Sequence, residues 1–105
     1  MRFTTDADVN GTSLQGYIRC KYSTLVKVFG EPSDGDGYKV DAEWAVQFED
    51  GTIATVYNWK DGVNYLGEDE GMPVQFITDW HIGGNDGNAI HCVEVAIQNY
   101  PLNNL

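Results

Sequence analysis

Residues 39–60 read KVDAEWAVQFEDGTIATVYNWK, and this stretch decides the fold of the chain. Apolar residues occupy every second position from Val40 to Phe48, which is the period of a β-strand with one buried face. Asp50-Gly51 is typical of a two-residue hairpin turn, and the alternation resumes at Ile53. The stretch therefore predicts an antiparallel hairpin over residues 38–60.

A two-residue turn fixes which residues face each other across this hairpin. In that register Phe48 faces Ile53, Trp44 faces Tyr57, and Trp59 lies further along the same face. The register therefore predicts an aromatic core face. The reverse face of the two strands is predicted to be polar.

The flanking sequence predicts two further strands and two helices. Strands are expected over 12–21, with a bulge at Gly16, and over 74–82, where Gly83-Gly84 ends the strand. A two-turn helix is expected after Ser23 as N-cap, ending at Gly30. A final helix over about 87–99 is expected to be capped by Asn85 or Asp86 and stopped by Pro101.

These elements predict an α+β fold in one domain, residues 1–105. The order β-α-β-β-β-α implies an antiparallel or mixed sheet of about four strands with both helices on its apolar face. Residues 1–11 are expected to form a loose arm, or a short strand followed by a turn. Residues 61–73 are expected to be an acidic, flexible connection.

The chain is strongly acidic, with 6 Lys and Arg against 16 Asp and Glu and a formal net charge of −10. Such a charge opposes direct contact with nucleic acid or anionic lipid. Two interpretations remain, an ordinary solvated acidic surface, or mimicry of DNA and docking onto a basic protein groove.

The cysteines, the first residues and the hydropathy point to a cytoplasmic protein. Cys20 and Cys92 form no metal-binding pattern, and we expect both thiols to be reduced and buried, with a single Cys20–Cys92 bridge as the alternative. The first residues lack the apolar segment of a signal peptide, and no apolar run is long enough to span a membrane. Neither a metal nor a cofactor is expected.

The polar reverse face of the sheet is the predicted binding site. The candidate ligand-binding residues are Glu43, Asn58, Lys60, Asp79 and His81, the Gly83-Gly84 loop, and a small positive spot made by Arg19 and Lys21. Amide, imidazole and ammonium groups near aromatic rings suit a nucleotide base and ribose. The alternatives are an ordinary solvated sheet face and, at the glycine loop, an ordinary strand-to-helix turn instead of an anion site. No nucleophile–base–orienter arrangement is visible, so no catalytic residue is predicted.

Three pieces of the sequence resemble a group of short proteins encoded by bacterial viruses, most without an assigned role. The pieces contain FGEP at 29–32, EWAVQFEDGT at 43–52 continuing into YNWK at 57–60, and WHIGG at 80–84. The resemblance implies a viral origin and action on a host system. It assigns no functional residue.

Together these observations predict a non-enzymatic viral accessory protein that counters host defence by sequestering a small nucleotide-derived signal. The first alternative is an acidic inhibitor or DNA mimic that blocks a host nucleic-acid-binding protein. The second is a small nucleotide-processing enzyme. The many aromatic residues also favour a homo-oligomer, with a homodimer as the commonest closed form.

Overall fold

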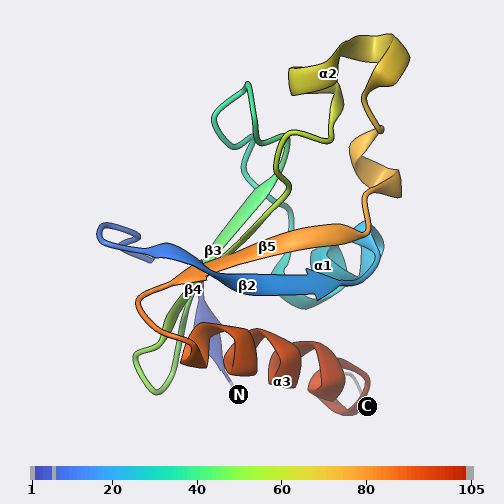
Figure 1. Cartoon of the computed structure of the whole chain (residues 1–105). Helices are drawn as coiled ribbons and strands as arrows, with labels where there is room; N and C mark the ends of the chain where they lie inside the picture. Colours follow the sequence, from blue (N-terminus) through green and yellow to red (C-terminus); the bar gives the residue numbers. More distant parts are fainter. Residues whose placement is uncertain (1, 6, 104–105) are drawn as a thin grey trace.

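The computed structural model describes residues 2–5 and 7–103 and has an α+β architecture (Figure 1). Within this part of the chain, five strands form one antiparallel sheet in the order β1-β3-β4-β5-β2. The strands are β1 (Phe3–Thr4), β2 (Ser13–Arg19), β3 (Glu43–Phe48), β4 (Ile53–Tyr57) and β5 (Asp79–Gly84). The helices are α1 (Tyr22–Phe29), α2 (Val63–Glu70), the 3-10 turn η1 (Val74–Phe76) and α3 (Asn88–Asn103).

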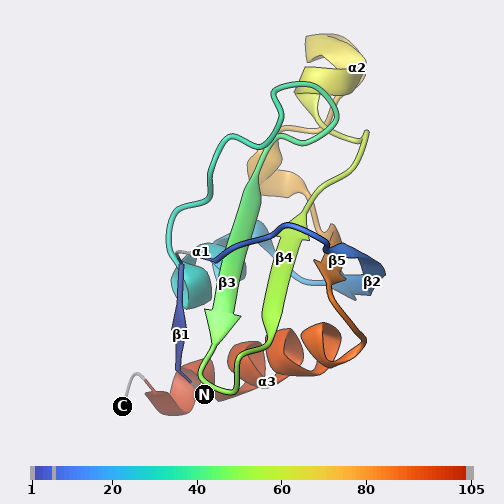
Figure 2. The same ribbon diagram turned by 90° about the vertical axis from the view of Figure 1, so that its left-hand side faces the viewer.

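The core lies between the sheet and two helices. Both α1 and α3 pack on the same face of the sheet, and Figure 2 shows the other face without a helix over it. The rings of Trp44 and Trp80 meet edge to face at 5.4 Å between centroids. Leu25 from α1 and Val93 from α3 close this core from the helical side. We call the face without a helix the open face.

The predicted hairpin is present, but its register differs by one residue. Trp44 pairs with Val56 instead of Tyr57. The cause is the loop, in which the Phe48 N–H donates to the Thr52 carbonyl at 2.8 Å and the Gly51 N–H donates to the Phe48 carbonyl at 2.9 Å. With φ of 91° at the glycine, this is a three-residue loop with a G1 bulge. The predicted two-residue turn was wrong.

The shift of register reverses the face of β4. Val56 lies in the core at 0% exposure, whereas Tyr57 is half-buried on the open face and Trp59 is 40% exposed. The predicted core face is therefore confirmed for Trp44 and Phe48 and wrong for Tyr57 and Trp59. Because β4 lies in the middle of the sheet, apolar residues occupy both of its alternating positions, and periodicity alone cannot assign its faces.

The α+β class and the antiparallel sheet are confirmed, while the strand number and the order are corrected. The added strand is β1, which falls in the expected arm over residues 1–11. Its Phe3 ring packs against Phe29 and Phe48, with centroids 5.1 and 6.0 Å apart, so part of this arm belongs to the core edge. Residues 1 and 6 of the arm lie outside the described residues.

The region 61–82 departs most from the prediction. The expected flexible connection contains α2, and the expected strand over 74–82 begins only at Asp79, after η1. The single turn of 3-10 helix breaks the period of two, so Ile77 is buried at 1% exposure and Phe76 is 64% exposed. The predicted faces are therefore reversed for Phe76 and Ile77 but confirmed for Trp80 and Ile82, which are both buried. Gly83-Gly84 belongs to β5 instead of a loop.

The helix ends agree with the prediction in part. Gly30, with φ of 90°, ends α1 as predicted. The predicted N-cap, Ser23, lies inside α1, because the Lys21 carbonyl already accepts the first helical hydrogen bonds. The final helix starts at Asn88 and continues past Pro101, so the predicted stop was wrong. A proline costs one helical hydrogen bond and crowds the carbonyl four residues back, which disfavours a longer helix without forbidding it.

One connection must cross the sheet, because β1 and β2 lie at its opposite edges. Figure 2 shows that the chain between them runs over the open face, in front of β3 and β4. We call residues 7–12 the crossing segment. Its turn is held by the Thr12 hydroxyl, which donates to the Val9 carbonyl at 2.8 Å. The crossing segment therefore limits the open face on one side.

Candidate functional site

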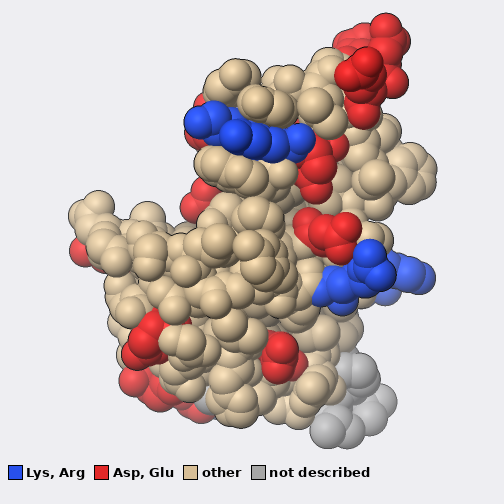
Figure 3. Space-filling model, in the orientation of Figure 1, with Lys and Arg blue, Asp and Glu red and all other residues tan. Residues whose placement is uncertain are grey.

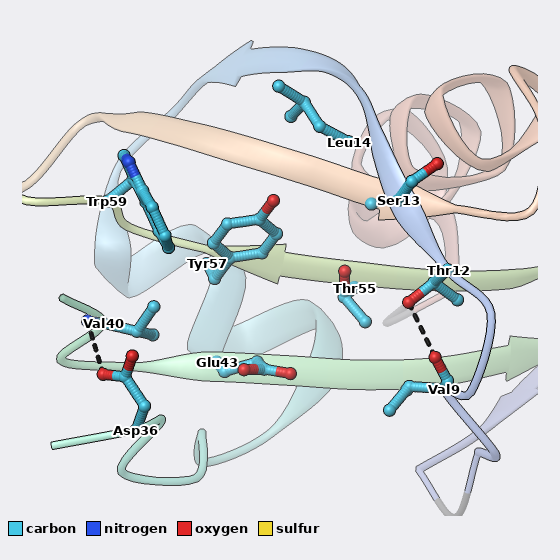
Figure 4. Close-up of a pocket in the computed structure, with 11 residues that line it drawn as sticks. Val9, Thr12, Ser13, Leu14, Asp36, Val40, Glu43, Thr55, Tyr57 and Trp59 are labelled. Atoms are coloured by element: carbon cyan, nitrogen blue, oxygen red, sulfur yellow. Dashed lines mark hydrogen bonds between the residues drawn. The ribbon is translucent and has the colours of Figure 1, made fainter. Parts of the chain in front are cut away.

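A pocket of about 300 Å³ lies on the open face, between the crossing segment and Trp59 (Figure 4). Its floor consists of residues from the three central strands, Glu43, Thr55, Tyr57 and Gly83. Its walls are Val9, Thr12, Ser13 and Leu14 on one side and Asp36, Val40 and Trp59 on the other. Gly83 keeps the floor open, because a side chain at this position would collide with the Thr55 hydroxyl.

Aromatic side chains continue from the pocket across the open face. The Tyr57 ring lies 6.3 Å from the Trp59 ring and 5.5 Å from the His81 ring, both edge to face. The imidazole of His81 also stacks against Trp59 at 6.4 Å and meets Tyr17 at 4.8 Å. These four residues, Tyr17, Tyr57, Trp59 and His81, are called the aromatic cluster. They expose aromatic surface on the open face that a planar ring can contact.

Burial shifts the titration of three groups at this site. The pKa of Glu43 is raised, first by its partial burial and then by the negative charge of Asp36. The pKa of His81 is lowered by burial, against the opposing effect of Asp61, so the imidazole is neutral at pH 7. Burial and the charge of Glu43 raise the pKa of Tyr57, which keeps its hydroxyl protonated. The pocket therefore holds the Glu43 carboxyl group and the Tyr57 phenol on neighbouring strands.

Two lysines border the aromatic cluster. The Lys39 and Lys60 ammonium groups lie 5.5 and 5.6 Å from the centroid of the Trp59 ring. Lys39 also lies over Tyr38, and Lys60 lies over Tyr65. In the orientation of Figure 1, Figure 3 shows Lys and Arg atoms in two separate groups, one of them at the end of the molecule where α2 projects.

Five of the predicted site residues share the open face. Glu43 and Gly83 line the pocket, and His81 belongs to the aromatic cluster beside it. Arg19 and Asp79 form an exposed ion pair at 3.1 Å at the far end of the same face. The ion pair occupies both groups, so the predicted positive spot at Arg19 is largely neutralised.

The structure places three other predicted residues elsewhere. Asn58 is 0% exposed; its side-chain oxygen accepts the Asp41 and Ala42 N–H groups, and its amide donates to the carboxylates of Asp41 and Asp61. It cannot project from the sheet, because the reversed face of β4 turns it inward. Gly84 packs against Ala89 of α3, and Lys21 lies at the start of α1. Lys60, the ninth predicted residue, borders Trp59.

At the strand-to-helix turn after β5, the side chain of Asp86 already occupies the predicted anion site. The Asp86 carboxylate accepts the Asn88 N–H at 3.0 Å, and the Asp86 carbonyl accepts the Ala89 N–H at 3.2 Å. An acidic side chain at the start of α3 satisfies the free N–H groups there. The ordinary-turn interpretation is therefore the one the geometry favours.

Sequence reasoning missed several pocket residues. Thr55, Tyr57 and Trp59 share a clear period of two, but that period was assigned to the core. Residues 1–11 are predicted as a loose arm or as a short strand followed by a turn, and neither prediction places Val9 at the wall of a pocket. Lys39 also alternates with the core residues of β3 and could have been placed beside Lys60 across the hairpin. The signal was therefore present for Tyr57, Trp59 and Lys39.

Other features of the described residues carry no ligand site. Both cysteines are free; Cys92 is buried, and partial burial raises the pKa of Cys20 to about 11. In the described ranges, no three His, Cys, Asp or Glu side chains gather as metal ligands would. No helix among the described residues is long and apolar enough to cross a membrane.

The comparisons with known proteins identify no relative. No protein-family model matches the chain, and no curated protein matches it significantly in sequence. Neither comparison supports the resemblance to viral proteins. Function therefore has to be argued from the geometry of the open face.

Proposed function

We propose that this protein binds a small nucleotide-derived molecule on its open face and does so without chemical turnover. The observation that carries the proposal is the pocket itself, a concave site bordered by the accessible Trp59 indole and floored by Tyr57 and Glu43. A sheet face lined with aromatic rings and left without a helix exposes apolar surface that a ligand would cover.

The chemistry of the pocket fits the base and ribose of a nucleotide. A planar base can stack on Trp59 or Tyr57, with the gain of offset aromatic contact. The Glu43 carboxylate can accept a hydrogen bond from an amino group or a ribose hydroxyl, and the Thr55 hydroxyl lies beside it. In the setting expected from the sequence, such binding would withhold a nucleotide signal from a host defence system.

Isothermal titration against a panel of ribonucleotides, cyclic nucleotides and ADP-ribose derivatives tests the proposal. We expect heat with at least one compound, a loss of affinity of about tenfold or more in Trp59→Ala, and recovery of the compound unchanged by mass spectrometry. Phe76→Ala is the matched control, since Phe76 is exposed but lies outside the pocket. Absence of heat with every compound would refute the proposal.

A second candidate, an acidic inhibitor of a basic nucleic-acid-binding protein, is favoured by the charge distribution. No Lys or Arg follows Lys60 in the sequence, and Glu68, Asp69 and Glu70 are exposed at the projecting end of α2. Electrostatic docking of this kind weakens steeply with salt. A partner captured at low salt should be released at high salt; retention at high salt would contradict this candidate.

A further inference from the structure

We infer that Lys39 and Lys60, held against the Trp59 indole, form a subsite for one phosphate, so that the preferred ligand is a nucleoside monophosphate. This inference rests on the proposed function, because it places the phosphate of a molecule whose base lies in the adjoining pocket. Trp59 is shared by both parts, since it lines the pocket and also contacts the two ammonium groups.

The first supporting observation is the pairing of two like charges. Both ammonium groups lie within 5.6 Å of one ring centroid, and the Lys60 N–H donates to the Lys39 carbonyl at 2.8 Å. The one ion pair found among the described residues joins Arg19 to Asp79, so neither lysine is engaged in one there. Two ammonium groups that contact the same ring can both attract an anion bound beside that ring, and their attractions add.

The second observation is the backbone of Lys60. It has φ of 61°, and no other non-glycine residue of the described chain has a positive φ. This left-handed conformation is unfavourable for a residue with a side chain, and strain of this kind gathers at functional sites. Glycine would relieve the strain at this turn, yet the position carries a lysine aimed at the Trp59 ring.

The third observation limits the ligand to few charges. Asp36 and Glu43 line the same pocket as Trp59. The Asp36 carboxylate accepts the N–H groups of Tyr38 and Val40, which lower its pKa and hold it ionised beside Lys39. Further phosphates would meet these carboxylates and the net charge of −10. The subsite therefore favours one phosphate over three.

Titration of the four common ribonucleosides, their 5′-monophosphates and their 5′-triphosphates, at low salt, tests the inference. We expect at least one monophosphate to bind about tenfold tighter than its nucleoside, as a charge-assisted contact should. The triphosphate should bind no tighter than the monophosphate. The double variant Lys39→Met with Lys60→Met should abolish the preference, so that nucleoside and monophosphate bind with equal affinity.

Lys27→Met is the control, because Lys27 is exposed on α1, behind the sheet, and its substitution should keep the preference. Equal affinity for nucleoside and monophosphate would overturn the inference while the proposed function stands. A preference that survives the double variant would also overturn it. If no nucleoside and no nucleotide binds, the proposed function fails and the inference fails with it.

Discussion

The two faces of the sheet use aromatic residues in opposite ways. On the helix-covered face Trp44 and Trp80 are buried against each other and against α1 and α3. On the open face Tyr57 and Trp59 also belong to an aromatic cluster, but no helix covers them. The same residue types therefore stabilise the fold on one face and remain available for contact on the other.

This difference separates core residues from candidate binding residues more clearly than composition can. The uncovered face of an antiparallel sheet is ordinarily polar, because water solvates it. Here that face carries rings instead, with Glu43 and two lysines around them. The aromatic residues of the open face are thus not accounted for by core formation, which is why we propose a binding role for them.

The largest expected effect comes from removing one tryptophan from each face. Trp80→Ala should lower the free energy of unfolding by about 4 kcal/mol, since it opens a cavity and leaves the Cys20 carbonyl without its indole donor. Trp59→Ala should lower it by no more than about 1 kcal/mol, the size of its exposed cation–π contacts. Urea unfolding measures both, and equal losses would show that the two faces do not differ as described.

Asn58→Ala tests the buried network that ends β4. The substitution leaves the N–H groups of Asp41 and Ala42 without their acceptor, and we expect a loss of about 3 kcal/mol in urea unfolding. Asn64→Ala is the matched control at an exposed asparagine, with an expected change within about 0.5 kcal/mol. A change as small in Asn58→Ala as in the control would show that the hydrogen bonds of Asn58 do not stabilise the fold.

Lys60→Gly should separate stability from binding. Glycine accepts a positive φ, so the free energy of unfolding should rise by about 1 kcal/mol. Affinity for a nucleoside monophosphate should fall at the same time, because one ammonium group is lost. A stabilised protein that keeps full monophosphate affinity would contradict this expectation.

The smallest effect concerns pH and Glu43. Because partial burial raises the folded-state pKa above the ordinary value of 4.5, the folded protein binds this proton more tightly than the unfolded chain. Stability of the wild type relative to Glu43→Gln should therefore fall as pH rises from 4.5 through the higher folded-state pKa, and then level off. Urea midpoints for both proteins across this range measure the difference; a rise with pH would contradict the assignment.

The sequence predicts the α+β class and most of β3, because the long alternation of apolar and polar residues in β3 fits only a strand with one buried face. It does not predict the register, because a three-residue loop at Gly51 and a two-residue turn share the same residues. β1 is too short to leave a pattern, and its pairing depends on Phe3 reaching Phe48. Local periodicity carries no information on the type of hairpin loop or on the long-range pairing of β1 with β3.

The candidate site was predicted in the same uneven way. The alternation in β3 and β5 correctly predicts Glu43 and His81 on the open face, whereas Gly83 was predicted in a loop after the strand. Asn58 was assigned to the open face from β4, where both alternations are apolar and the face depends on the loop. The pocket walls at Val9 and Asp36 come from connections, whose course across the sheet follows from topology alone.

The unequal burial of the tryptophans also makes the molecule its own optical probe. Trp44 and Trp80 are 3% and 0% exposed, so a dissolved quencher such as iodide can reach neither indole, whereas Trp59 is 40% exposed. Quenchable fluorescence from this protein therefore reports on Trp59 alone. Any compound that shields this ring from iodide occupies the open face, and its affinity can be read from unlabelled, unmodified protein.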